Sequence, residues 1–142
     1  MLKSFFIDNN IEQKIENPIY HPNNIDQAVN EGMGFYEYCK LLKQDDKQIG
    51  LTITIAFSYY LINEFDFKLY KDKTPEYPLR FMTLKYNKDG GVISLYPFEY
   101  SLKVLNSEAK YSDLLEKMKY NIQNIPTASE FMQNIKNNLN KE

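Results

Sequence analysis

Residues 79–97 read LRFMTLKYNKDGGVISLYP and carry the clearest structural signal in this chain. Two runs rich in strand-forming residues lie on either side of Asp89-Gly90. An Asp-Gly pair between such runs is typical of a hairpin, because both central positions of a type I′ turn need positive φ. The sequence therefore predicts an antiparallel hairpin that turns at Asp89-Gly90.

The position of this turn also determines which side chains face each other across the two strands. The expected pairs are Lys88 with Gly91, Tyr86 with Ile93 and Leu84 with Leu95 on one face, and Lys85 with Ser94 and Thr83 with Tyr96 on the other. The first face is apolar and the second is mostly polar. A slip of one residue would expose the apolar side chains of one strand to water. The Asp-Gly turn and the alternation of side chains therefore support the same register.

The most apolar segment, QIGLTITIAFSYYLINEFDF, fits two periods. Its alternation is compatible with a strand over residues 51–58, whereas apolar spacing of three and four residues favours a helix over residues 47–65. Its length exceeds that of most strands, and Asp45-Asp46 supply an N-cap and favourable charge in a first helical turn. We therefore predict the helix, keep the strand as the alternative, and expect the segment to cover the hairpin face that carries Leu84 and Leu95.

The rest of the chain predicts an α+β fold, with an antiparallel β-meander of about three strands packed against four to five helices in a single domain over residues 1–142. The third strand is expected at residues 67–70. The other expected elements are a short strand at 4–7, one or two helical turns at 11–15, a loop at 16–24, a helix at 25–42 capped by Asn24, a strand or a helix at 98–105, a helix at 107–125 capped by Ser107, and a last helix that begins at the capping box Thr127–Glu130.

Composition places the chain among ordinary globular domains. It has 142 residues, of which 43% are hydrophobic and 25% are charged. No run reaches the roughly 18 uncharged apolar residues of a membrane span, and no N-terminal signal segment is expected. Because the single cysteine cannot form an internal disulfide, we expect a reducing compartment, the cytoplasm.

Charge is divided unevenly along the chain. Residues 1–66 contain five lysines and ten carboxylates, whereas residues 67–142 contain twelve basic and nine acidic residues. The pI of about 5.5 argues against direct binding of nucleic acid. Twelve tyrosines favour a protein interface, where tyrosine is enriched, although an AT-rich genome also produces such a composition.

No catalytic, cofactor-binding or metal-binding motif is present in the sequence. One cysteine and one histidine cannot supply a zinc site, and no GxSxG motif occurs. We interpret His21 as a solvated loop residue and Cys39 as a small core residue on the apolar stripe of its helix. Arg80, the only arginine, is expected to pair with Glu76 or Glu99 at the surface.

Two pairs of acidic residues are the remaining candidates for chemistry. Asp45 with Asp46, and Glu64 with Asp66, lie close in sequence and could hold Mg²⁺ or act in acid/base catalysis. Acidic residues near helix ends more often cap the helix or solvate it. We therefore predict no catalytic residues and keep a small enzyme with a carboxylate-based site as an alternative.

The stretch YPLRFMTLKYNKDGGVISLYPFEYSLKV followed by an amphipathic helix, in a small acidic domain rich in tyrosine, resembles bacterial toxin-immunity proteins. The resemblance is one of overall character. It implies a non-catalytic inhibitor that binds a cognate toxin domain stoichiometrically, with another binding or regulatory module as the alternative. Many such toxins are basic nucleases, which the acidic half of this chain could attract.

If this interpretation holds, acidic residues and exposed tyrosines should contact the partner. The candidate contacts are Asp45, Asp46, Glu64 and Asp66, with Tyr59 or Tyr60 as an apolar anchor, whichever faces outward. The oligomeric state does not follow from the sequence.

Overall fold

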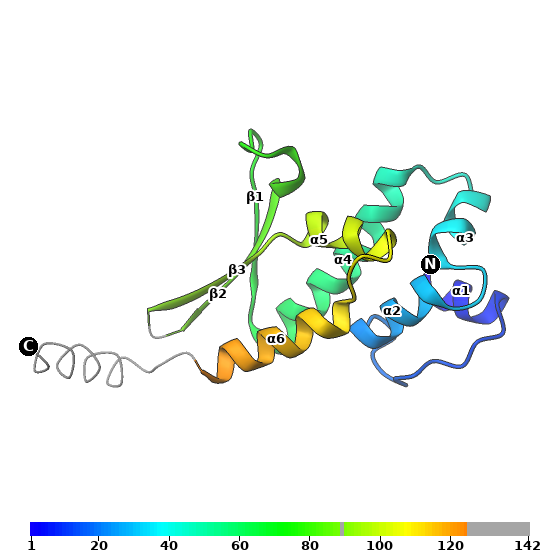
Figure 1. The fold of residues 1–142 in the computed structure, drawn as a ribbon, viewed down its shortest axis with the longest axis horizontal. Coiled ribbons are helices and arrows are strands. Elements are labelled where there is room, and N and C mark those ends of the chain that lie inside the picture. The colour runs from blue at the N-terminus through cyan, green and yellow to red at the C-terminus, as the bar shows by residue number, and fades with distance from the viewer. Residues whose placement is uncertain (89, 125–142) are drawn as a thin grey trace, which may run out of the picture.

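The computed structural model describes residues 1–88 and 90–124 and has an α+β fold. Its helices are α1 (Leu2–Asp8), α2 (Pro22–Asn30), α3 (Phe35–Leu41), α4 (Asp46–Phe65), α5 (Pro97–Leu105) and α6 (Tyr111–Gln123), with a short 3₁₀ helix η1 (Pro78–Arg80). Its strands are β1 (Lys68–Lys71), β2 (Met82–Lys88) and β3 (Gly91–Leu95). The sheet lies at one end, α1 to α3 lie at the other, and α4 to α6 lie between them (Figure 1).

The sheet is an antiparallel meander of order β1-β2-β3, as predicted. Leu84 pairs with Leu95 and Lys85 with Ser94, so the predicted register is confirmed along the length of β3. The expected pair of Thr83 with Tyr96 lies beyond the last residue of β3. Gly90 has a φ of 85°, which a tight turn needs and glycine adopts without steric cost, while Asp89 lies outside the described residues.

The helical prediction for residues 47–65 is confirmed, and the strand alternative is wrong. Asp45 accepts a hydrogen bond from the Gln48 backbone N–H at 2.8 Å, and the Gln48 side chain accepts one from the Asp45 N–H at 2.9 Å. This capping box satisfies two backbone donors that a helix start leaves free. At the other end, Asp66 in the left-handed conformation ends the helix.

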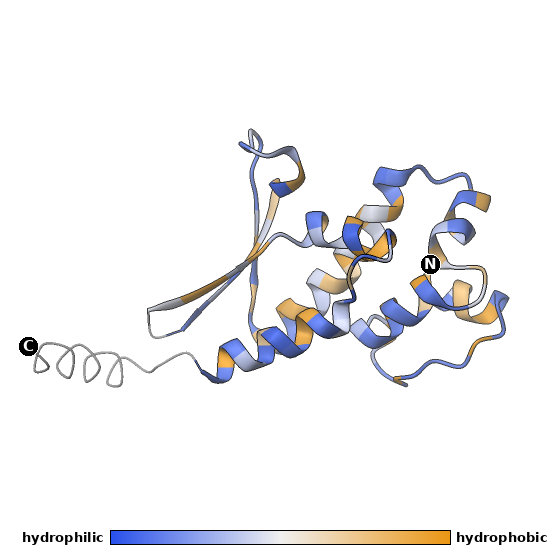
Figure 2. Ribbon diagram, viewed as in Figure 1, coloured by the Kyte–Doolittle hydropathy of each residue, from blue (hydrophilic) through white to orange (hydrophobic). Residues whose placement is uncertain are grey.

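The expectation that α4 alone covers the hairpin is only partly right. Helix α4 packs against β1 and α5, whereas α5 packs against β2. Leu84 is fully buried in the core, and Leu95 is half-buried against it. Hydrophobic residues gather where α4, α5 and α6 meet (Figure 2), and there the Phe57 and Tyr111 rings stack at 4.4 Å.

The single helix predicted over residues 25–42 is wrong, because the structure divides it into α2 and α3. Gly32 and Gly34 adopt φ values of 63° and 85° between them, a backbone that breaks an α-helix. The helix also begins earlier than predicted, with His21 rather than Asn24 as its N-cap. Asn24 is instead buried and binds the backbone N–H and C=O of Ile15.

Two predictions near the N-terminus are also wrong. Residues 4–7 lie in α1 rather than in a strand, since Leu2, Phe5 and Phe6 form one buried helical face. Residues 11–15 form a loop rather than helical turns, and the Gln27 side chain, which accepts from the Lys14 N–H at 3.0 Å, fixes that loop to α2.

Toward the C-terminus, the ambiguous segment at 98–105 is the helix α5, with Pro97 in its first turn. Ser107 does not cap the next helix, since it has a φ of 61° and α6 begins at Tyr111. The buried residues of α6 are three of those predicted, namely Tyr111, Leu115 and Met118. Ile125 and the last predicted helix with its capping box lie outside the described residues.

The prediction of His21 as a solvated loop residue is wrong, because its ring caps the start of α2. Its Nδ1 accepts a hydrogen bond from the Asn23 N–H at 3.0 Å, and its ring packs against Tyr60. Burial lowers the pKa of His21 below its ordinary value, the charge of Lys119 adds to this, and that of Glu64 opposes it. Protonation of Nδ1 would remove the acceptor and place a positive charge at a helix N-terminus.

We expect the protein to lose stability as the pH falls from about 6.5 toward the lowered pKa of His21, because only the unfolded chain takes up a proton in that interval. The loss should approach the worth of an N-cap, about 1 kcal/mol. Urea denaturation across this range measures it. His21→Asn keeps a capping acceptor that does not titrate, so its stability should change less; an unchanged pH dependence would contradict the cap.

Cys39 is fully buried on α3, which agrees with its prediction as a core residue. Burial raises the pKa of its thiol to about 11, so the reactive thiolate is scarce near neutral pH. We expect an aromatic disulfide reagent to label Cys39 slowly in the native protein and rapidly in denaturant. Fast labelling of the native protein, at a rate equal to that in denaturant, would show an accessible thiol.

Candidate protein-binding face on α4

Helix α4 carries apolar residues around its whole circumference. No charged residue occurs between Lys47 and Glu64. One face builds the core through its buried residues Ile49, Ile53, Phe57, Tyr60 and Leu61. A helix that is apolar all round is normally enclosed by protein, so the opposite face needs an explanation.

That opposite face is open to solvent at its centre. Ile55 is 59% exposed and Tyr59 is 53% exposed, and half-buried Leu51 and Ile62 continue the row at both ends. We call these four residues the α4 stripe. Their spacing of three and four residues places them on one side of the helix, the pattern by which helices pack against a partner.

The structure distinguishes the two tyrosines that the sequence left as alternatives. Tyr60 is only 7% exposed and packs against His21 and Phe65. Burial raises the pKa of Tyr60, with the charge of Glu64 as a smaller cause. Tyr59 points outward, with the ring of Tyr20 edge-on at 5.1 Å. Tyr59 is therefore the tyrosine placed to contact another molecule.

The four candidate carboxylates do not form one cluster. Asp45 and Asp46 lie at the start of α4, and Glu64 and Asp66 at its end, about 30 Å away for a helix of 20 residues. The two pairs therefore lie beyond opposite ends of the α4 stripe and do not face each other. They cannot act together on one metal ion or one substrate bond.

The N-terminal pair already has partners within the fold. Asp45 caps α4. Asp46 Oδ1 accepts from the Tyr36 hydroxyl at 2.6 Å and lies 3.0 Å from Lys40 Nζ. Hydrogen bonds from Tyr36 and then from Lys40 lower the pKa of Asp46. These two acids therefore stabilise the start of the helix.

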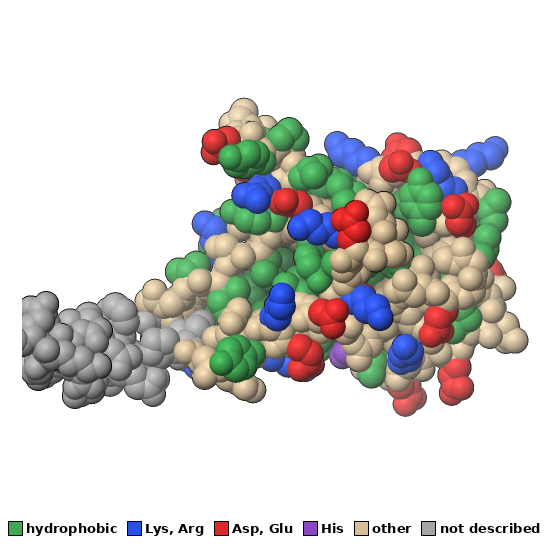
Figure 3. Space-filling view, in the orientation of Figure 1, with side chains coloured by type: hydrophobic (Ala, Val, Ile, Leu, Met, Phe, Trp, Pro, Cys, Tyr) green, Lys and Arg blue, Asp and Glu red, His purple; other side chains and the backbone are tan. Residues whose placement is uncertain are grey.

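The C-terminal pair is less engaged. Glu64 and Asp66 are both exposed, and within residues 1–88 and 90–124 neither side chain has an ion pair or a hydrogen bond. They lie at the same end of α4 as Tyr59. Figure 3 shows acidic and basic side chains interspersed over the helical part of the visible face, with no continuous acidic patch there. Glu64 and Asp66 therefore carry available negative charge at the C-terminal end of α4, where Glu64 lies on the side of Tyr60 and His21 rather than on that of Tyr59.

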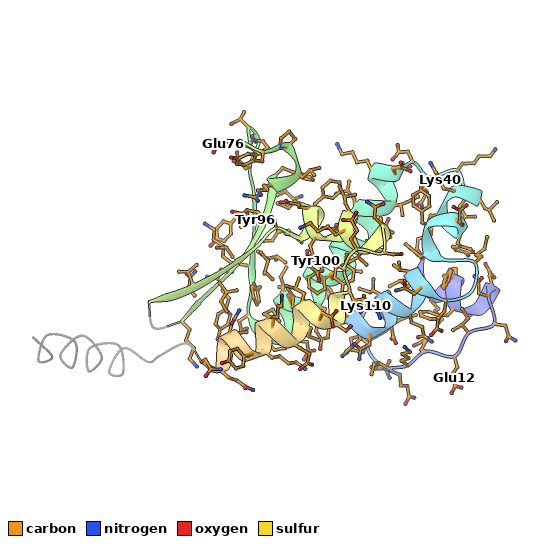
Figure 4. The ribbon with its side chains drawn as sticks, in the orientation of Figure 1. Glu12, Lys40, Glu76, Tyr96, Tyr100 and Lys110 are labelled. Carbon is orange, nitrogen blue, oxygen red and sulfur yellow. The ribbon has the colours of Figure 1, made fainter. Side chains whose placement is uncertain are left out.

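Arg80 pairs with Glu99, as one of the two predicted options. Its Nε lies 2.8 Å from a Glu99 carboxylate oxygen, and the guanidinium lies between the rings of Tyr77 and Tyr96. Glu76 lies away at the tip of the β1–β2 connection (Figure 4). These contacts of Arg80 connect η1 with the end of β3 and with α5. We therefore assign Arg80 a structural role.

The described part of the chain holds no cluster of acidic, histidine and cysteine side chains able to bind a metal. None of its helices has the length and apolar character needed to cross a bilayer. The carboxylate of Asp26 is buried and accepts hydrogen bonds from two backbone N–H groups of α6. The α4 stripe is thus a feature that the fold leaves unexplained.

The sequence contained a signal for this stripe that its interpretation missed. A run of 16 uncharged residues matched both the helical and the alternating period, because each face of the helix is apolar. In a small domain such a run indicates that one apolar face of the helix is left exposed to solvent, because the rest of the fold can cover only part of its circumference.

Comparison with known proteins gave no match to any family model, curated protein or solved structure.

Proposed function

We propose that this protein is a non-catalytic binding protein, of the toxin-immunity type, that engages its partner through the α4 stripe. The observation that supports this proposal is the exposure of Ile55 and Tyr59 at the centre of an uncharged helical face. Complete burial of an exposed apolar side chain is worth about 1.5–3 kcal/mol, so a partner that covers the exposed parts of Ile55 and Tyr59 would gain roughly half of that for each. An interface supplies this gain.

The composition of the stripe matches what protein interfaces use for affinity. A tyrosine near the centre of an apolar patch supplies large contact area with few side-chain torsions to restrict. Tyr59 is held from one side by Tyr20, which reduces the freedom it would lose on binding. Ile55 lies one turn away and continues the same surface.

The charges at the C-terminal end of α4 favour a basic partner. Glu64 and Asp66 have unpaired carboxylates in the described structure, and residues 1–66 as a whole are acidic. Opposite charges on two proteins raise the rate at which the proteins associate. This increase becomes smaller as salt screens the charges. A basic toxin nuclease domain fits this description, and blocking it by stoichiometric binding requires no catalytic residue in the inhibitor.

Where the reading frame next to this gene encodes a toxin-like domain, the test is a titration against that domain. Tyr59→Ala should weaken binding at least tenfold, as expected for a central anchor. Tyr120→Ala, a tyrosine exposed on α6, is the matched control and should leave the affinity unchanged. Glu64→Gln with Asp66→Asn should slow association at low salt and change dissociation little.

Growth rescue supplies the second measurement. Co-expression of this protein should protect cells from the toxin domain, and the Tyr59→Ala variant should protect them less. Absence of binding and of rescue, or equal losses for Tyr59→Ala and Tyr120→Ala, would refute the proposal.

A further inference from the structure

The outer face of the sheet, which points away from the helices, has an ordered arrangement of basic and aromatic side chains. Lys68 pairs with Lys85, and Lys85 pairs with Ser94, so these residues form a row across the three strands. Tyr70 pairs with Thr83 in the adjacent row. Lys68, Lys85 and Ser94 are exposed, and Tyr70 is 47% exposed.

The pairing of Lys68 with Lys85 is unfavourable for the isolated fold. Like charges directly opposite each other on a sheet destabilise the strand pair. None of the three strands contains a carboxylate, and within the described residues neither lysine has an ion pair. A bound anion would relieve this repulsion.

Aromatic rings lie beside the basic row. Lys85 Nζ is 5.4 Å from the centre of the Tyr70 ring, and the Arg80 guanidinium is 4.6 Å from that of Tyr96, which follows β3. Side chains two residues apart on one strand face are separated by about 6.6 Å. Positive groups and aromatic faces therefore adjoin each other on an open surface.

We propose that this outer sheet face binds single-stranded nucleic acid, with Lys68 and Lys85 contacting phosphates and Tyr70 stacking on a base. Proteins that bind single strands without sequence preference combine a basic track with exposed rings. An acidic peptide would use the lysines but has no planar bases to stack on the tyrosine. The joint presence of the two rows favours the nucleic acid.

The acidic pI, which led us to expect no nucleic-acid contact, averages over parts of the molecule with opposite charge. Charges farther apart than about 8 Å are largely screened at physiological ionic strength. Residues 68–88 contain six basic and two acidic residues, so the sheet is locally basic. The proposed site differs from the α4 stripe and requires no toxin partner, so each proposal can fail without the other.

Fluorescence anisotropy with a labelled single strand of about 12 thymidines measures this binding, a length within the usual site size. The full chain should bind at low salt, and the affinity should fall as salt rises. The double variant Lys68→Gln, Lys85→Gln should reduce the slope of log affinity against log salt by about 1.4, since each phosphate contact contributes about 0.7. Tyr70→Ala should weaken binding about fivefold or more.

Matched controls come from α6, which lies among the helices. Lys117→Gln and Tyr120→Ala remove an exposed lysine and an exposed tyrosine there, and neither should alter binding to the strand. Thermal unfolding of the double lysine variant should show undiminished stability, because a like-charge pair is removed.

Three results would overturn the proposal. The first is the absence of binding at low salt, and the second is an equal effect of the α6 and sheet variants. The third is binding of polyglutamate as tight as that of the strand with no effect of Tyr70→Ala, which would show a site for acidic chains only.

Discussion

Replacing Leu84 with alanine should lower the free energy of unfolding by about 2–5 kcal/mol, the range for truncating a fully buried leucine. Leu84 lies at the centre of β2, between Leu69 of β1 and Leu95 of β3. Its side chain is completely enclosed in the core. The cavity left by three missing carbon atoms could not collapse easily, because strands on both sides hold the backbone in place.

Lys85→Ala is the matched control for this experiment. Lys85 is adjacent in sequence but faces solvent, so its removal should change stability by less than about 0.5 kcal/mol. Urea denaturation of the two variants measures the difference. Equal losses would show that the faces of β2 are assigned wrongly and that the strand is shifted by one residue.

The hairpin and α4 were predictable because independent local signals agreed on each. At the hairpin, the turn residues and the alternation of side chains required the same register. At α4, segment length and the acidic pair Asp45-Asp46 at its start favoured a helix over a strand whose alternation matched equally well. Both elements depend on interactions within a few residues of each other in sequence.

Two predicted N-caps were wrong because the interactions that decide them lie outside the segment concerned. Asn24 looked like an N-cap because its type and position suit one, but its side chain holds the loop at Ile15 instead. Ser107 was assigned as the cap of a helix that starts four residues later. No pattern within either segment reveals the partner that determines its conformation.

The candidate site was predictable only as a list of residue types. The sequence placed Tyr59 and Tyr60 side by side, but which of them faces water depends on the packing of Tyr60 against His21 and Phe65. It also gave Asp45, Asp46, Glu64 and Asp66 together as contacts, although the helix predicted over residues 47–65 already separates the two pairs. The exposed centre at Ile55 emerged only from tertiary packing.

Among the described residues, Asp26 makes the side-chain hydrogen bonds that span the greatest distance in sequence. It lies buried on α2, yet its two carboxylate oxygens accept hydrogen bonds from the backbone N–H groups of Tyr111 and Ser112 at 2.7 and 2.8 Å. These are the first residues of α6, whose N–H groups have no partner within their own helix. A side chain 85 residues earlier therefore caps α6, in place of the local residue that the sequence suggested.

Asp26→Ala should consequently lower the free energy of unfolding by about 3 kcal/mol, because two charge-assisted hydrogen bonds are lost and buried donors are left unpaired. Asp26→Asn retains one acceptor oxygen and should lose less. Asp113→Ala, which removes an exposed acidic residue from the first turn of α6, should cost only about 0.3–1 kcal/mol. Urea denaturation ranks the three variants, and amide hydrogen exchange should show the largest loss of protection in α6 for Asp26→Ala. A loss no greater than that of Asp113→Ala would mean that α6 does not depend on α2 for its cap.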